Sequence, residues 1–300
     1  MATTAPLDQR ETAPEIVGPT RRLTDGPVIG FSTVSNTVYW LIHAACLLAF
    51  YTGVSAWDIG LCLGLFWFRL FAITGGYHRF FAHRAYKTSR VFQFLLALVG
   101  CTATQKGPLW WCGWHRHHHR NSDTKEDVHS PRFGFWYSHQ GWILDHTWRR
   151  TPSELIPDFA RYPELEWLNR YHFVPPLALA LGLTAFGGLS AFVWGYCIST
   201  TLLWHSTYTI NSLAHVWGTQ RYDTGDTSRN NFILALLTLG EGWHNNHHHY
   251  MASARQGFFW WEIDITYYIL RGLEALGIVW DLREPPERVR NASISTLKAT

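Results

Sequence analysis

Residues 114–120 (WHRHHHR) place four histidines within five consecutive positions. On a helix, His115, His118 and His119 lie at i, i+3 and i+4 and share one face, whereas His117 points elsewhere. Neutral imidazole is the commonest side-chain ligand for metal ions. The stripe therefore predicts half of a metal site, and the alternative is a solvated basic helix.

Three further segments carry polar side chains at similar spacings. HRFFAH contains His78 and His83, NSLAH contains Asn211 and His215, and GEGWHNNHHH contains a second stripe at i, i+3 and i+4. The members of that second stripe are His244, His247 and His248. Together with the first stripe they supply nine imidazoles and one amide, too many for one ion. We expect two ions, and imidazole suits iron, copper, zinc and nickel alike.

The remaining histidines are expected to have other roles. His117 and His249 lie off the two stripes, and His129 is a candidate to support a ligand imidazole. Glu241 is expected to orient a ligand, because the spans contain no Glu for a carboxylate-rich di-iron bundle. The five histidines that are isolated in the sequence are expected to be packing or surface residues, namely His43, His139, His146, His172 and His205.

Four apolar stretches are each about as long as the ~20 residues that a membrane helix needs, namely 37–56, 58–77, 173–189 and 190–213. Apart from Arg69, every Lys and Arg lies outside them, and cytoplasmic segments carry the Lys/Arg excess. The sequence predicts an all-α integral membrane protein with four transmembrane helices in two hairpins. A helical cap that holds the histidines, and both termini, are expected on the cytoplasmic side.

The other segments complete this plan. Residues 1–35 are expected to be a flexible cytosolic segment, 36–282 the membrane domain and 283–300 a polar tail. Residues 91–103 are apolar but too short to cross, and a helix is expected over 232–248. The five cysteines form no CxxC pair, so thiolate ligands are not expected. The net charge of +3 is not massed into one arm, which argues against nucleic acid as a partner.

HRFFAH, HRHHH, NSLAH and HNNHH resemble the histidine boxes of membrane fatty acyl desaturases of the stearoyl-CoA (Δ9) type. The resemblance extends from about residue 74 to 282 and includes FGFWYSHQGW, DTSRNN and SARQGFFWWEID. It implies two iron ions with dioxygen as co-substrate, and an acyl tunnel whose kink imposes a cis product. The ligands that it implies are His78, His83, His115, His118, His119, His215, His244, His247 and His248, with Asn211 acting through a water.

The resemblance also assigns residues to the tunnel. Gln105, Trp111 and Thr207 match the three positions that hold the kink, and Phe66 and Leu70 are expected to close the methyl end. Removing hydrogen from an unactivated methylene needs an oxidant that no side chain provides, so metal and dioxygen must supply it. The electrons must come from a separate donor protein, either a ferredoxin or a cytochrome b5-like protein with its reductase.

One departure from the family pattern concerns the recognition of the substrate's head group. Where family members that hold coenzyme A place an Arg-Asp pair, this chain has Gly113 and Trp114. The resemblance implies an oxygen-dependent desaturase that acts, at Δ9, on a long-chain saturated acyl-CoA or acyl-lipid in the bilayer, and an acyl-carrier substrate stays open. The alternatives are a fatty-acyl or alkyl hydroxylase with the same site, and, in another class, a membrane metal transporter or metal-binding protein.

Overall fold

The computed structural model of the chain describes residues 34–292. The expectations for residues 1–33 of the N-terminal segment and for 293–300 of the tail lie outside the described residues. Helices make up most of the regular structure, as predicted. The two strands found in the described part, β1 (Lys87–Thr88) and β2 (Val279–Trp280), form one short antiparallel pair.

The first apolar hairpin begins with α1 (Val34–Ala45), η1 (Cys46–Leu48) and α2 (Ala49–Thr52). After a turn at Gly53, whose φ is +69°, α3 (Ala56–Phe71) runs back and continues as the π-helical segment η2 (Ala72–Ala82). Ser55 caps α3, because its side chain accepts from the Asp58 amide while Asp58 accepts from the Ser55 amide.

The second hairpin consists of α9 (Val174–Ala191), η7 (Phe192–Ile198) and α10 (Ser199–Asn211). Three helical segments are long and apolar enough to cross a membrane, namely Val34–Thr52, Ala56–Ala82 and Val174–His215. The third has 42 residues and is interrupted at Gly188, whose φ of 66° is not helical, and α9 packs against η7 beyond it. This single 42-residue segment therefore contains both arms of the second predicted hairpin.

Polar contacts join the two hairpins. The Ser190 hydroxyl donates to Asp58 at 2.7 Å near both turns. Arg69 on α3 is buried, and its guanidinium donates to Thr200 and Ser199 on α10 and to the Thr102 carbonyl. These bonds satisfy the one cation of the stem, which we define as residues 34–71 and 174–211, and they fix α3 against α10.

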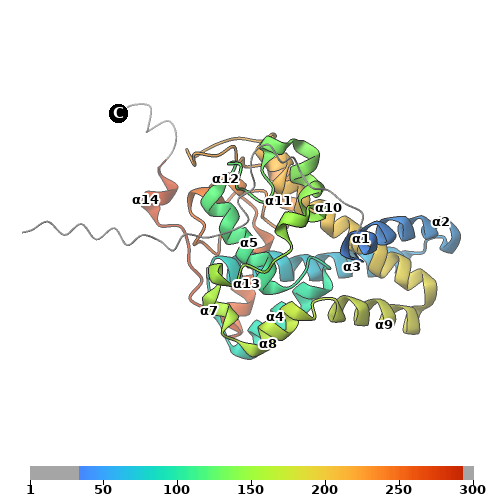
Figure 1. Ribbon diagram of the computed structural model, residues 1–300. Helices are drawn as coiled ribbons and strands as arrows, with labels where there is room; N and C mark the ends of the chain where they lie inside the picture. Colours follow the sequence, from blue (N-terminus) through green and yellow to red (C-terminus); the bar gives the residue numbers. More distant parts are fainter. Residues whose placement is uncertain (1–33, 293–300) are drawn as a thin grey trace, which may run out of the picture.

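The remaining described residues, 72–173 and 212–292, form the cap, which lies at one end of the stem (Figure 1). In the cap, α4 (Arg90–Thr102) packs against η2, against α8 (Pro163–Arg170) and against the stem helix α9, and α5 (Pro108–Asn121) packs against η2. The cap helices are α4 (Arg90–Thr102), α5 (Pro108–Asn121), η3 (Pro131–Phe133), η4 (Tyr137–Gly141), α6 (Trp142–Leu144), η5 (His146–Trp148), η6 (Ser153–Leu155), α7 (Pro157–Ala160), α8 (Pro163–Arg170), η8 (Leu213–His215), α11 (Phe232–Leu237), α12 (His244–His249), α13 (Ile265–Ala275) and α14 (Glu287–Arg290).

The single helix predicted over 232–248 is wrong, because the structure has two helices there. The backbone leaves the helical region at Leu239 (φ 58°) and at Gly240 (φ 115°). A Cβ at Gly240 would lie 2.4 Å from an Asp264 oxygen, so only glycine fits this turn. The break lets α12 point its histidines at α5 independently of α11.

The first residues of the predicted polar tail pack on the cap. The Arg283 amide donates to the Ala85 carbonyl, and the Ala254 amide donates to the Arg283 carbonyl. The Tyr222 hydroxyl donates to the Arg290 carbonyl at 2.8 Å. Residues 283–290 therefore connect three distant parts of the cap.

Candidate metal centre and cavity

Five elements bring the predicted ligands to one place beside the stem. His78 lies on η2 and His83 directly follows it, the first histidine stripe lies on α5, and the second lies on α12. Asn211 ends α10, and His215 lies on η8 immediately after it. Because every residue of η2 is buried, His78 is enclosed within the cap.

Five imidazoles form a first group, whose ligand atoms all lie within 4.8 Å of one another. The Nε2 atoms of His83 and His115 are 2.9 Å apart, as are those of His119 and His247. The fifth, His78, has its Nε2 3.0 Å from that of His247. Nitrogen lone pairs that converge in this way fit one bound cation.

A second group contains His118, His244 and His248, again within 4.8 Å of one another. His215 joins it, because its Nε2 is 3.2 Å from the Nε2 of His244. A cavity adjoins this group, and Asn211 lines it together with His118 and His244. The two groups divide the nine predicted imidazoles into five and four, and the donor set fits two cations that share one buried site.

Carboxylates hold the outward nitrogens of four of these imidazoles. The Nδ1 of His118 is 2.9 Å from Asp127, that of His215 is 3.1 Å from Asp123, and that of His248 is 2.6 Å from Asp226. His78 is paired with Glu241 in the same way. A carboxylate at Nδ1 keeps the proton there and leaves the Nε2 lone pair for a metal.

Sequence reasoning found one of these four carboxylates. Glu241 was predicted to orient a ligand, and it contacts both His78 and Arg79. Asp123 and Asp127 were missed because they lie in a turn-rich segment, and Asp226 was missed because its segment is typical of a helix N-terminus. The available signal was a group of acidic residues close in sequence to histidine stripes.

The electrostatics of the cap fit neutral, metal-binding imidazoles. Burial lowers the pKa of His83, His115, His119 and His247 well below 6.5, and neighbouring imidazoles lower these pKa values further. Burial opposes the charged form of Asp127, but His118 and His129 outweigh it and hold the pKa of the carboxyl below its usual range. These four imidazoles are therefore neutral, and the Asp127 carboxylate is charged.

His129 supports this site by packing. Its ring lies 4.2 Å from the ring of His118, centroid to centroid. Its Nδ1 is 3.9 Å from Asp127, and among the described residues that buried nitrogen has no hydrogen-bond partner. Burial lowers the pKa of His129 to about 3, so the ring stays neutral beside the ligand.

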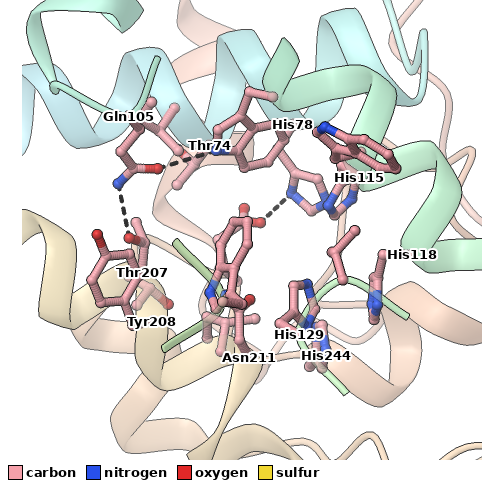
Figure 2. A pocket seen from close by; sticks show the side chains of 18 of the residues that line it. Thr74, His78, Gln105, His115, His118, His129, Thr207, Tyr208, Asn211 and His244 are labelled. Carbon is pink, nitrogen blue, oxygen red and sulfur yellow. Dashed lines mark hydrogen bonds and ion pairs between the residues drawn. The ribbon is translucent and has the colours of Figure 1, made fainter. Parts of the chain in front are cut away.

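A cavity of about 80 Å³ adjoins the imidazoles, and Gln105 and Thr207 lie across it from them (Figure 2). The Gln105 side-chain amide donates to the Thr207 hydroxyl at 2.9 Å, and the Trp111 indole donates to the Gln105 carbonyl oxygen at 3.1 Å. The three residues expected to hold the tunnel kink are therefore hydrogen-bonded to one another.

A second cavity, of about 640 Å³, continues from the first into the stem. Both are lined by Gln105, Trp110, Trp111, Trp142 and Tyr208. Farther along, its lining comes from α1, α9 and η7, so a long apolar path ends beside the imidazoles.

Phe66 and Leu70 line neither of these two cavities, although they were expected to close the tunnel. Both are buried in the hydrophobic core of the stem. Ile73 and Thr74 line the first cavity instead, because they lie where α3 changes into the wider π-helical turns of η2. In the second cavity, the residues deepest in the stem include Ile42, Ala180, Phe192 and Tyr196.

The two histidines predicted to be off the ligand faces lie outside both groups. His117 is 2.8 Å from the Glu126 carbonyl, and His249 stacks on Tyr222 with ring centroids 4.0 Å apart.

Three of the histidines expected to be packing or surface residues are hydrogen-bonded to one another. The Nε2 of His43 is 3.1 Å from that of His205, and His139 is 2.9 Å from His205 and from Ser212. All three are packed, as expected, and they lie close together because α1, α10 and η4 meet there. The contacts join α1 to α10 and to η4 of the cap.

Comparisons with known proteins are consistent with this geometry. A family model described as fatty acid desaturase matches residues 54–278. A sn-1 stearoyl-lipid 9-desaturase of Anabaena variabilis is 38% identical over 83% of this chain and 93% of its own length. A palmitoyl-monogalactosyldiacylglycerol delta-7 desaturase of Arabidopsis thaliana is 40% identical over 73% of this chain and 60% of its own. An icosanoyl-CoA 5-desaturase of Limnanthes douglasii is 38% identical over 85% and 73%.

Proposed function

The chain belongs to the fatty acid desaturase family, and on that premise we propose that it inserts a cis double bond at Δ9 of a long-chain saturated fatty acyl substrate. The reaction removes two hydrogens from adjacent methylenes, and one dioxygen with two electrons and two protons leaves as two waters. The observation that carries the proposal is the long apolar path that ends beside nine converging imidazoles.

We propose that the two imidazole groups hold two iron ions. The first ion would be held by His78, His83, His115, His119 and His247. The second would be held by His118, His215, His244 and His248, with Asn211 acting through a water. When bound, the iron pair supplies with dioxygen the oxidant that an unactivated methylene requires.

The protein's own part is to position the chain and exclude water. In this proposal, the Gln105–Thr207 pair and Trp111 bend the acyl chain and present one pair of methylenes to the imidazole groups. Trp110, Trp114 and Trp142 line the same cavity and keep bulk water from it.

The placement in the membrane is part of the proposal. Four spans in two hairpins would put the cap, the metal centre and both termini on the cytoplasmic side, because the Lys and Arg residues lie at that end. Electrons would then reach the metals from a separate cytoplasmic donor, a ferredoxin or a cytochrome b5-like protein with its reductase.

Expression of the full chain in a host that makes saturated acyl chains tests the proposal. Gas chromatography of the host's fatty acids should show a cis Δ9 monoenoic product. Expression of His247→Ala, which removes a ligand of the first group, should leave the profile unchanged. A hydroxylated product would favour the hydroxylase alternative, and an unchanged profile with metal accumulation in the host would favour a metal transporter.

A further inference from the structure

The second cavity opens on the side of the stem, between α1 and α9. Four apolar residues both line it and are exposed at the surface. Val34 and Val38 on α1 are 82% and 40% exposed, and Phe173 and Leu177 at the start of α9 are 54% and 52% exposed. A rim of exposed apolar side chains on both sides is suited to lipid, not to water.

The rim lies near the cap end of both helices. Helix α1 begins its described course at Val34 and α9 begins at Val174, and both run away from the cap (Figure 1). In the proposed topology, this level is the cytoplasmic leaflet of the bilayer. An acyl chain that is already in that leaflet can reach the cavity without crossing water.

One cation lies where the head of such a lipid would be. Lys106 lines the cavity, and its Nζ lies 3.9 Å from the centre of the Trp110 ring. None of the described residues that line this cavity is an Asp or a Glu. A half-buried ammonium without a carboxylate at hand favours an anionic ligand, because such a ligand offsets the cost of its burial.

The neighbourhood adds to the positive potential. Burial lowers the pKa of Lys106 to about 8, and Arg149 acts on that pKa in the same direction. Lys106 is therefore still mostly charged at neutral pH. His172 also lines the cavity, and burial lowers its pKa to about 4, so it is a neutral hydrogen-bonding group there.

We propose that the substrate is the acyl chain of an intact, anionic phospholipid, which enters sideways from the bilayer between α1 and α9 with its phosphate on Lys106. The inference rests on the proposed function and names its substrate class. The cavity volume of about 640 Å³ lies within the roughly 300–1,000 Å³ typical of sites that bury a small ligand. Coenzyme A also carries phosphates, so the test must separate a thioester in water from a lipid in the membrane.

The test is photo-crosslinking of the full chain in lipid nanodiscs, with a diazirine near the methyl end of the probe's acyl chain. Three probes are compared: phosphatidylglycerol, neutral monogalactosyldiacylglycerol and a soluble acyl-CoA. We expect the phosphatidylglycerol probe to label cavity residues such as Ile42, Ala180 and Tyr196, and excess acyl-CoA not to compete.

The cation is tested with this probe set. Lys106→Met should lower labelling by phosphatidylglycerol about tenfold, as expected for one lost charge-assisted hydrogen bond, and leave the galactolipid signal unchanged. Lys106→Arg should retain most of the labelling. Lys87→Met is the matched control, since Lys87 is exposed and paired with Asp281 away from the cavity.

The mouth is tested by two tryptophan substitutions on α9. Leu177→Trp should lower labelling by both lipid probes, because residue 177 lines the opening. Leu181→Trp is the control, since Leu181 is 61% exposed but does not line the cavity. Size-exclusion profiles identify any variant that fails to fold.

Two results would overturn the proposal. Acyl-CoA that labels the cavity residues as strongly as phosphatidylglycerol and displaces it would show entry from water. Equal labelling by the galactolipid and the phospholipid would show that Lys106 does not bind the lipid phosphate. Labelling requires neither iron nor turnover, so its outcome is independent of whether the chain proves to be a desaturase.

Discussion

At the scale of single residues, the partner of each outward imidazole nitrogen decides whether the inward nitrogen can bind a metal. Asp226 holds the Nδ1 of His248 at 2.6 Å. Burial opposes its ionisation, but His248 outweighs burial and holds the pKa of the Asp226 carboxyl well below its usual range. The carboxylate is therefore charged whenever the site is loaded.

We predict that Asp226→Asn weakens iron binding by about 10- to 100-fold, because the amide no longer fixes the proton on Nδ1. Metal titration of the purified protein measures this. Asp223→Asn is the control, since Asp223 is exposed and bonds only locally to the Gly225 amide. Equal metal affinities for the two variants would mean that Asp226 stabilises only its own loop and has no effect on metal binding.

A second prediction separates the stripes from their neighbours. His118→Ala and His247→Ala each remove one inward nitrogen, so both should lose metal and abolish activity. His117→Ala and His249→Ala should keep most of both, because these rings bind backbone carbonyls outside the two groups. Metal analysis and product yield of the four variants provide the test, and uniform loss would contradict the assignment.

At the scale of elements, helix α9 supplies a wall of the second cavity. Ala180 lines it and is buried, whereas Ala178, two residues away, is exposed on the outer face. The same substitution at the two positions therefore distinguishes an effect inside the cavity from one on the helix itself.

We predict that Ala180→Leu shifts the products toward shorter acyl chains, because extra methylenes in a filled site cost roughly 1–3 kcal/mol. That corresponds to about tenfold or more in selectivity. Ala178→Leu should leave chain length unchanged. Gas chromatography of the products measures both, and a change in double-bond position without a change in chain length would place Ala180 elsewhere along the path.

The elements also show where sequence reasoning worked. Histidine stripes are predictable because helical spacing and ligand chemistry coincide, and the structure brings the four boxes together as expected; that they bind metal stays a prediction. The break at Gly240 was not predictable, since the apolar pattern runs on through residues 232–239 and the reason for the turn is the distant Asp264. Leu70 lines neither of the two cavities, whereas Ile73 and Thr74, where α3 passes into η2, line the first one; that Leu70 closes the tunnel stays a prediction.

At the scale of the whole molecule, a small apolar stem carries a cap in which charged and polar groups are buried. Hydropathy and charge placement predict that division, because they sum over many residues. They do not predict the histidine string from His43 through His205 to His139, which depends on three helices meeting. Contacts between distant elements leave no local pattern in the sequence.

We predict that removing metal destabilises the cap as a whole. Each ion present at 100 times its Kd adds ~2.7 kcal/mol of stability, so loss of two should lower Tm by roughly 10 °C or more. Intrinsic tryptophan fluorescence during heating of chelated and loaded protein measures this. Zinc should restore Tm without restoring desaturation, and an unchanged Tm after verified metal loss would contradict the site.

The contact between His78 and His247 joins residues 169 positions apart in the chain. During synthesis the ribosome must therefore complete both membrane hairpins before the last stripe, on α12, exists to close the first group. Until then the earlier histidines form an incomplete set of ligands. In the proposed function, metal loading is consequently a late event in the life of the chain, and the iron available at that moment would decide which molecules become active.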